Sequence, residues 1–235
     1  MKIRFGLIAA CLLAITAIAP AKEPSINELG SATPAIAAAA LDQVLANADT
    51  TSASALYIAA GAALKAGKLS DAGFLFYAAR IRTAFDQALF PPRGAGGDSP
   101  LVALGALQFQ LGSSLNPTLM ADPKAYAAAV EKVKAWTPRA PDDYQPGWEY
   151  KQRTTLKAAE DAIRDLRAKF IEQMGSLSTL LNDERYFAAF RTVQKFNRGP
   201  ATERPPREAY DAALKTMREI ETVKGIPGPA SRVKG

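Results

Sequence analysis

The sequence predicts an all-α protein of about eight helices, arranged as antiparallel hairpins. Alanine, the strongest helix former, fills 47 of the 235 positions. Proline and glycine recur at positions typical of helix starts and stops, and no segment shows the alternating apolar pattern of a β-strand. These observations place a helical-hairpin unit in the N-terminal half and a long, heptad-patterned helix in the C-terminal half.

Three helices are predicted between residues 34 and 85. Pro34 opens an alanine-rich helix over 35–48. Two further apolar stretches, 54–66 and 69–85, have helical spacing and are separated by Gly67, which suits a tight turn between helices. We therefore expect the second and third helices to pair as a hairpin.

The next two helices share one start signal. Ser99-Pro100 and Asp122-Pro123 each combine an N-cap residue with proline at the first helical position. Leucines at helical spacing continue the first of these helices to Gly112, where we expect it to end. The second is stopped by Pro138.

A proline-rich loop over 137–148 is predicted to separate two helical layers. The N-terminal layer covers 22–136 and the C-terminal layer covers 149–225. The last residues, 226–235, combine glycine and proline with few large apolar side chains, and we expect them to be disordered.

The C-terminal layer opens with a long helix from Leu156 to Leu180. Gly175 is expected to bend or end it, and shorter helices follow over 185–196 and 207–223, the last stopped by Gly225. Apolar residues recur in the long helix every seven positions, with a second matching set between them, which predicts a seam against another helix of the same chain or, alternatively, of a second copy. The two sets are Leu156, Ile163, Phe170 and Leu177, and Ala159, Leu166 and Leu180.

The first 21 residues have the pattern of a secretory signal peptide. Basic residues precede an apolar run from Phe5 to Ala19, and a cleavage site between small residues ends at Ala21. We therefore expect a periplasmic or secreted bacterial protein whose mature chain begins at Lys22 and carries no transmembrane segment. Two alternatives remain open: an uncleaved anchor, and lipidation of Cys11, which lies in a sequence similar to a lipoprotein cleavage box.

Composition excludes several kinds of chemistry. The chain has no histidine, and its one cysteine lies in the predicted signal peptide. This excludes Ser-His-Asp catalysis, thiol catalysis and metal sites built on histidine or thiolate. The glycine patterns of phosphate-binding loops are absent as well. We therefore expect a protein that is not an enzyme and that needs no cofactor and no metal.

The charge is modestly basic. The formal net charge is +6, and removal of the two basic residues in the predicted signal peptide lowers it to +4. This suits weak contact with anionic components of a cell envelope. No basic run carries interleaved aromatic residues, so we expect no nucleic-acid partner.

The segment from Tyr57 to Ala79 resembles a tetratricopeptide or Sel1-like helical hairpin. Small residues, a turn glycine and one aromatic residue occur in the order of that motif. They are Ala60, Gly67, Ala72, Phe76 and Ala79. A generic hairpin of two alanine-rich helices is the alternative. The order of residues around this segment is also similar to that of small exported bacterial proteins of no assigned activity.

The resemblance implies that the first helix of the hairpin lines a concave face that holds a protein or peptide. Plain core positions are the alternative for the apolar members of this face. Two arginines near the end of the second helix add potential anion ligands, or alternatively interact with the helix dipole. The candidate partner-binding residues are Tyr57, Gly61, Leu64, Lys65, Arg80 and Arg82.

The sequence thus predicts an exported protein-binding or adaptor module whose partner lies in the cell envelope. One alternative is a periplasmic immunity protein that neutralises a toxin. Another is a cell-wall enzyme that cleaves glycans with carboxylates, for which Asp142, Asp143 and Glu149 lie among aromatic residues.

Overall fold

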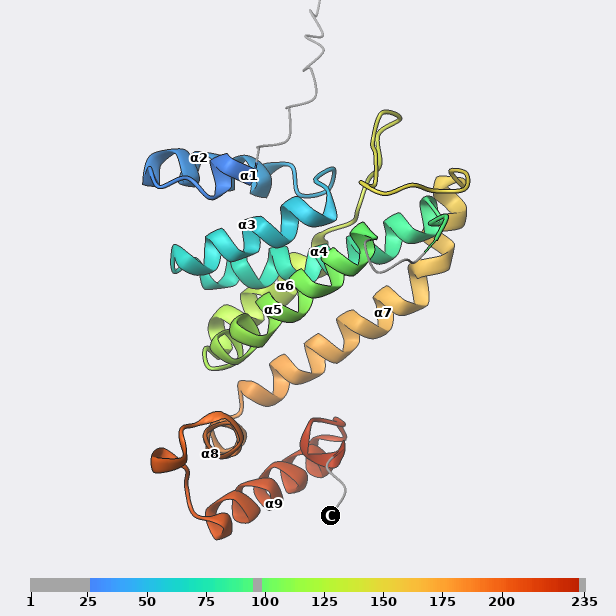
Figure 1. The fold of residues 1–235 in the computed structure, drawn as a ribbon. Helices are drawn as coiled ribbons and strands as arrows, with labels where there is room; N and C mark the ends of the chain where they lie inside the picture. Colours follow the sequence, from blue (N-terminus) through green and yellow to red (C-terminus); the bar gives the residue numbers. More distant parts are fainter. Residues whose placement is uncertain (1–25, 95–98, 233–235) are drawn as a thin grey trace, which may run out of the picture.

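The computed structural model describes residues 26–94 and 99–232 (Figure 1). This part of the chain contains nine α-helices, two short 3-10 helices and no β-strand, which confirms the all-α prediction. The predicted signal peptide lies outside the described residues.

Eight of the nine α-helices correspond to predicted ones, and the short first helix was not predicted. Their bounds are α1 Ile26–Leu29, α2 Pro34–Ala46, α3 Ala53–Lys65, α4 Leu69–Leu89, α5 Pro100–Met120, α6 Pro123–Ala135, α7 Leu156–Leu181, α8 Glu184–Arg198 and α9 Arg207–Lys224, with the 3-10 helices η1 Ala201–Glu203 and η2 Ala230–Arg232.

Local signals set the ends of several helices as expected. The Ser99 hydroxyl accepts a hydrogen bond from the Leu101 amide at 3.3 Å, and the Asp122 carboxylate accepts one from the Ala125 amide at 2.9 Å. Each side chain satisfies an amide that the first helical turn leaves without a partner. Gly67 and Gly225 follow α3 and α9 with positive φ angles of 71° and 65°, a conformation that glycine adopts without strain.

The predicted helix end at Gly112 is wrong because glycine is used there for packing, and Gly175 does not end α7. Helix α5 continues through Gly112 to Met120, and α7 continues through Gly175. A Cβ at position 112 would lie 3.0 Å from the Phe76 ring, so glycine lets α5 approach α4 closely there. Burial of Leu115 and Leu119 beyond Gly112 stabilises the additional turns of α5.

Helix α4 lies at the centre of the fold and is contacted by α3, α5, α6 and α7 (Figure 1). The α3–α4 hairpin is present, and its small residues lie where the two helices meet. Ala60, Ala72 and Ala79 have no exposed surface, and Phe76 fills the space beside them. The large side chains of α4 are therefore buried on almost every side.

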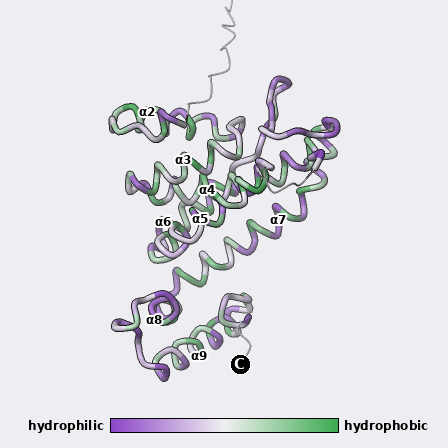
Figure 2. The backbone as a smooth tube through the Cα atoms, viewed as in Figure 1, coloured by the Kyte–Doolittle hydropathy of each residue, from purple (hydrophilic) through white to green (hydrophobic). Residues whose placement is uncertain are grey.

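Helix α7 packs within the chain, against α4 and α6, and leads to α8 and α9 at its far end (Figure 1). Ala159, Ile163 and Leu180 of the predicted seam are buried, but Leu156 and Leu166 are exposed. Hydrophilic residues gather on α8 and on the long loop before α7 (Figure 2).

The loop before α7 is fastened to the end of α4. The Trp148 indole donates a hydrogen bond to the Phe90 carbonyl at 3.0 Å, and the Thr154 amide donates one to the Leu89 carbonyl at 2.8 Å. The Arg153 guanidinium donates to the Ala140 carbonyl at 3.3 Å, within the same loop. This loop, residues 136–155, is thus held across the N-terminal layer and is called the strap.

The expectation of disorder over 226–232 is corrected, whereas residues 233–235 lie outside the described range. The buried Glu221 carboxylate accepts hydrogen bonds from the Ala230 amide at 3.0 Å and the Ser231 amide at 2.8 Å, and from the Tyr186 hydroxyl at 2.8 Å. These bonds hold the tail on α9, which buries Ala230 completely. Sequence patterns did not show it because one acidic side chain supplies the contact.

Candidate functional site

The structure buries one residue of the binding face that was predicted on α3. Tyr57 is 1% exposed, and its hydroxyl donates a hydrogen bond to the Gln108 side chain of α5 at 3.1 Å. Burial raises the pKa of Tyr57 to about 12. Gly61 and Leu64 are half-buried, and Lys65 is exposed. Tyr57 is therefore a core residue that joins α3 to α5, and it cannot contact a partner.

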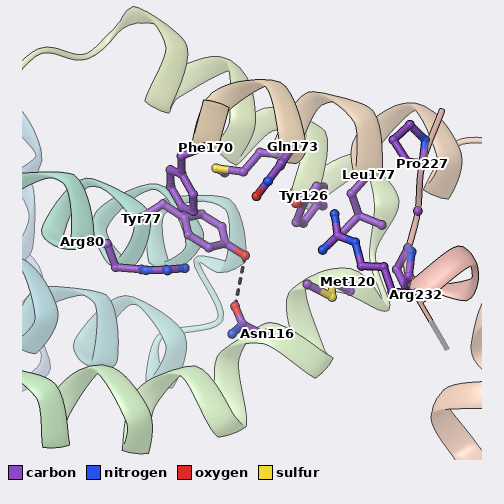
Figure 3. Close-up of a pocket in the computed structure, with 13 residues that line it drawn as sticks. Tyr77, Arg80, Asn116, Met120, Tyr126, Phe170, Gln173, Leu177, Pro227 and Arg232 are labelled. Atoms are coloured by element: carbon purple, nitrogen blue, oxygen red, sulfur yellow. Dashed lines mark hydrogen bonds between the residues drawn. The ribbon is translucent and has the colours of Figure 1, made fainter. Parts of the chain in front are cut away.

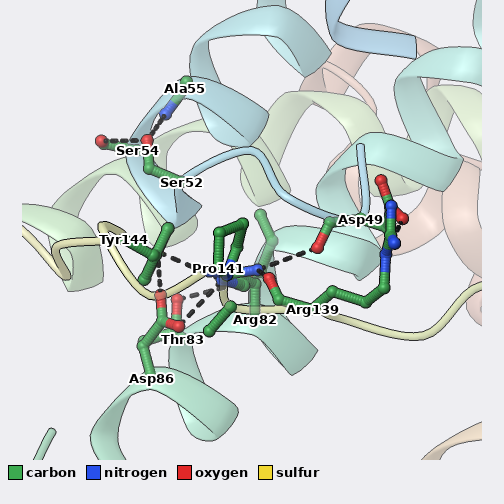
Figure 4. A network of polar contacts seen from close by, with 12 residues as sticks. Asp49, Ser52, Ser54, Ala55, Arg82, Thr83, Asp86, Arg139, Pro141 and Tyr144 are labelled. Atoms are coloured by element: carbon green, nitrogen blue, oxygen red, sulfur yellow. Dashed lines mark hydrogen bonds and ion pairs between the residues drawn. The ribbon is translucent and has the colours of Figure 1, made fainter. Parts of the chain in front are cut away.

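Arg82 is also removed from the candidate binding residues, because its side chain has no exposed surface. Its Nε lies 2.8 Å from Asp86 Oδ1, one helical turn later. Its Nη1 donates hydrogen bonds to the backbone carbonyls of Asp49 at 3.0 Å and Arg139 at 2.7 Å (Figure 4). Arg82 thus ties the loop before α3 and the strap before α7 to α4.

Tyr144 completes this buried network. Its hydroxyl donates to Asp86 Oδ2 at 2.6 Å and accepts from Arg82 Nε at 3.2 Å (Figure 4). The Arg82 guanidinium carbon lies 3.9 Å from the centre of the Tyr144 ring. Burial raises the pKa of Asp86, and the Arg82 charge opposes that rise. Because every member faces the interior, the network serves the fold.

Arg80 is exposed and lies on the opposite side of α4 from Arg82. Its guanidinium carbon lies 4.8 Å from the centre of the Phe170 ring of α7. In the described part of the chain Arg80 forms no ion pair. Of the six predicted binding residues, Arg80 is the one that lines the hollows described below.

The first hollow at Arg80 holds about 200 Å³ and is called the arginine hollow (Figure 3). Arg80 reaches it from one end and Arg232 from the other, with α7 on one side. At its middle the Tyr77 hydroxyl donates a hydrogen bond to Asn116 Oδ1 at 3.0 Å. Burial raises the pKa of Tyr77 to about 12, so this hydroxyl stays a neutral donor at ordinary pH.

A second, larger hollow of about 390 Å³ adjoins the first and is called the apolar hollow. It lies between the end of α5, α7, the α8–α9 hairpin and the C-terminal tail. Apolar side chains of three helices line most of it, including Leu177, Phe190, Val193, Leu214 and Met217.

A third hollow of about 290 Å³ lies on the other side of Arg80 and Phe170 and is called the α5–α7 hollow. Leu166 of α7, Gln108 of α5 and several residues of α4 line it. Leu166 is 55% exposed there. Among the described residues, no acidic side chain lines any of the three hollows, whereas Arg80, Arg198 and Arg232 do.

The outer side of α5 carries an exposed apolar stripe. Phe109 is 81% exposed and Val102 is 50% exposed. They are seven residues apart, as are Phe109 and Asn116, so all three project from one side of the helix. Asn116 lines two of the hollows. The stripe therefore leads along α5 toward the hollows. The stripe was not predicted, although its seven-residue spacing is present in the sequence.

The carboxylates considered for glycan cleavage line none of the three hollows described above. Asp142, Asp143 and Glu149 are all exposed on the strap. The neighbouring aromatic side chains point inward: the Tyr144 hydroxyl contacts Asp86, and Trp148 is buried. The aromatic residues therefore do not form a sugar platform beside these acids.

Other site types leave no trace in the described residues. No group of three or more acidic, histidine or cysteine side chains is placed to hold a metal ion there. None of the helices in this part combines the length and the apolar character needed to cross a membrane. Comparison of the chain with models of known families, with curated proteins and with solved structures gives no match.

Proposed function

We propose that this chain is a non-enzymatic binding protein of the cell envelope, which captures a protein or peptide along the apolar stripe of α5 and the α5–α7 hollow. The observation that carries the proposal is the exposure of Phe109. Phe109 shares one side of α5 with the exposed Val102, and contiguous exposed apolar patches mark interaction sites. The predicted signal peptide supports an envelope location.

The chemistry of this surface suits a protein partner. Phe109 and Val102 on α5 and Leu166 on α7 offer apolar area, and Arg80 offers a cation at the end of the hollow. Aromatic residues and arginine are enriched at protein interfaces and supply most of the residues whose loss weakens binding strongly. This surface replaces the concave α3 face as the proposed partner site, because Tyr57 is buried.

The test is capture of a partner by immobilised protein, residues 22–235, from a periplasmic extract of the source organism. We expect one stoichiometric protein that survives a salt wash. Phe109→Ser should weaken its retention by about tenfold or more, because truncation of an aromatic anchor costs about 2 kcal/mol. Phe109→Ser should keep the thermal stability of the wild type, since the Phe109 side chain is exposed.

Val223→Ser is the matched control, because Val223 is 87% exposed on α9 and lies away from this surface. It should retain the partner like the wild type. Equal retention by both variants, or no stoichiometric partner, would reject the proposal. A captured toxin whose activity is blocked at one-to-one ratio would identify the partner class as that of an immunity protein.

A further inference from the structure

We infer that the arginine hollow and the apolar hollow together form a binding site for a single-chain anionic amphiphile, such as a fatty acid. The acyl chain occupies the apolar hollow and the anionic head lies between Arg80 and Arg232. This ligand is a small molecule, and Phe109 and Val102 do not line its site, although Arg80 borders both sites; the inference therefore goes beyond the proposed protein-binding function.

The two hollows are continuous. Asn116, Met120, Leu177 and Pro229 line both of them. The larger hollow is mostly apolar, and the smaller one is lined by two tyrosines, two side-chain amides and two guanidinium groups. Ligand sites commonly combine an apolar enclosure with a few polar groups that orient the ligand. A molecule with one apolar end and one polar end matches this division.

The charges select an anionic head. Arg80 and Arg232 enter the arginine hollow from opposite ends (Figure 3), and neither forms an ion pair within residues 26–94 and 99–232. No acidic side chain of the described chain lines either hollow to compete for them. The contact of Arg80 with the Phe170 ring holds its guanidinium beside the opening. A guanidinium binds carboxylate or phosphate oxygens through two parallel hydrogen bonds.

The dimensions favour one extended chain over a helical partner. An α-helix with its side chains is about 10–12 Å across, which exceeds what a hollow of about 200 Å³ can hold. The tail segment 227–232 also walls this side, and its attachment to Glu221 keeps it there. The enclosure therefore suits a flexible acyl chain.

The test is calorimetric titration of residues 22–235 with three probes that share a ten-carbon chain, each below its micelle concentration. The probes are decanoate, decanol and decyltrimethylammonium. We expect decanoate to bind at one per chain and at least about tenfold more tightly than the other two, because only the carboxylate gains charge-assisted hydrogen bonds. Each methylene removed from the carboxylate series should weaken binding about two- to fourfold.

Two arginine variants test where the anionic head of the ligand binds. Arg80→Gln and Arg232→Gln should each weaken decanoate binding by about tenfold and leave decanol binding within twofold. Arg185→Gln is the matched control, because it removes the same charge from an exposed position at the start of α8. It should leave all three affinities unchanged. Circular dichroism of each variant checks that the fold is retained.

Any of three results would overturn the inference. The first is no decanoate binding. The second is equal affinity for the anionic, neutral and cationic probes, which would indicate apolar adsorption alone. The third is loss of selectivity in Arg185→Gln as large as in the two hollow variants, which would indicate a general charge effect. Phe109→Ser should leave decanoate binding intact, so this result is independent of the fate of the protein partner.

Discussion

The buried pair of Arg82 and Asp86 offers a direct test of what holds the N-terminal layer together. Both side chains have no exposed surface and their charged atoms lie 2.8 Å apart. The test compares Arg82→Met, Asp86→Leu and the double variant. Each single change leaves one charged or strongly polar group buried without its partner, whereas the double change leaves an apolar pair of similar volume.

The geometry sets the magnitudes. Asp86→Leu leaves the Arg82 charge buried and should cost about 3–5 kcal/mol. Arg82→Met should cost at least as much, because the carbonyls of Asp49 and Arg139 also lose their charged donor, at about 1.5–3 kcal/mol for each bond. The double variant loses these donors as well but leaves no lone charge. It should therefore be less destabilised than the sum of the single variants by at least about 2 kcal/mol.

The measurement is urea unfolding followed by circular dichroism at 222 nm, with the free energies of unfolding combined in a double-mutant cycle. Tyr144→Phe is a useful companion, because it removes only the hydroxyl that contacts Asp86 and should cost about 1–2 kcal/mol. Additivity of the two main changes within about 0.5 kcal/mol would refute the reasoning, since independent sites behave in that way.

Three further predictions concern packing, titration and the tail. Gly73→Ala places a methyl group 2.6 Å from a Leu119 methyl carbon and should lower the free energy of unfolding by about 1–2 kcal/mol. Gly61→Ala meets open space and should be neutral or stabilising by up to about 1 kcal/mol. Equal effects of the two changes in urea unfolding would contradict this prediction. Five tyrosines have pKa values raised by burial, so above pH 10 the unfolded chain releases protons that the folded chain keeps, and the free energy of unfolding falls. Tyrosinate absorbance at 295 nm should therefore rise together with the loss of helix. Ionisation of all tyrosines while the protein is still folded would argue against their burial. These five are Tyr57, Tyr77, Tyr126, Tyr144 and Tyr186. The methyl group of Gly228→Ala would overlap the Glu221 carboxylate, so the amide hydrogens of residues 230 and 231 should exchange with solvent at least about tenfold faster. Unchanged protection of these amides would show that the tail is held in another way.

Helix positions were predictable where one or two neighbouring residues decide them. Ser99 and Asp122 start helices through their own side chains, and Gly67 ends one through its backbone freedom. These signals act within a single turn, so they can be read without the rest of the chain. The same local reading failed at Gly112, because a helix also continues where distant residues such as Phe76 need it close by.

The candidate site was predictable only in part. The sequence placed Arg80 among the candidate anion ligands, whereas Arg232 was assigned to a disordered tail that the structure shows to be ordered. The contacts that order the tail come from Glu221 and Tyr186, on two other helices. Patterns within a segment do not report contacts between segments, so none of the three hollows was predicted.

The sequence by itself determined the helical composition, most helix starts, and the absence of histidine and cysteine chemistry from the described chain. Only the tertiary structure decided which side of each helix is covered. Arg80 and Arg82 show the reason. Two residues apart, they project about 200° from one another around α4. The strap and the loop before α3 bury Arg82, while Phe170 of α7 leaves Arg80 exposed at the hollows. The neighbours that make this distinction are up to 90 residues away in the chain, and only folding brings them to α4.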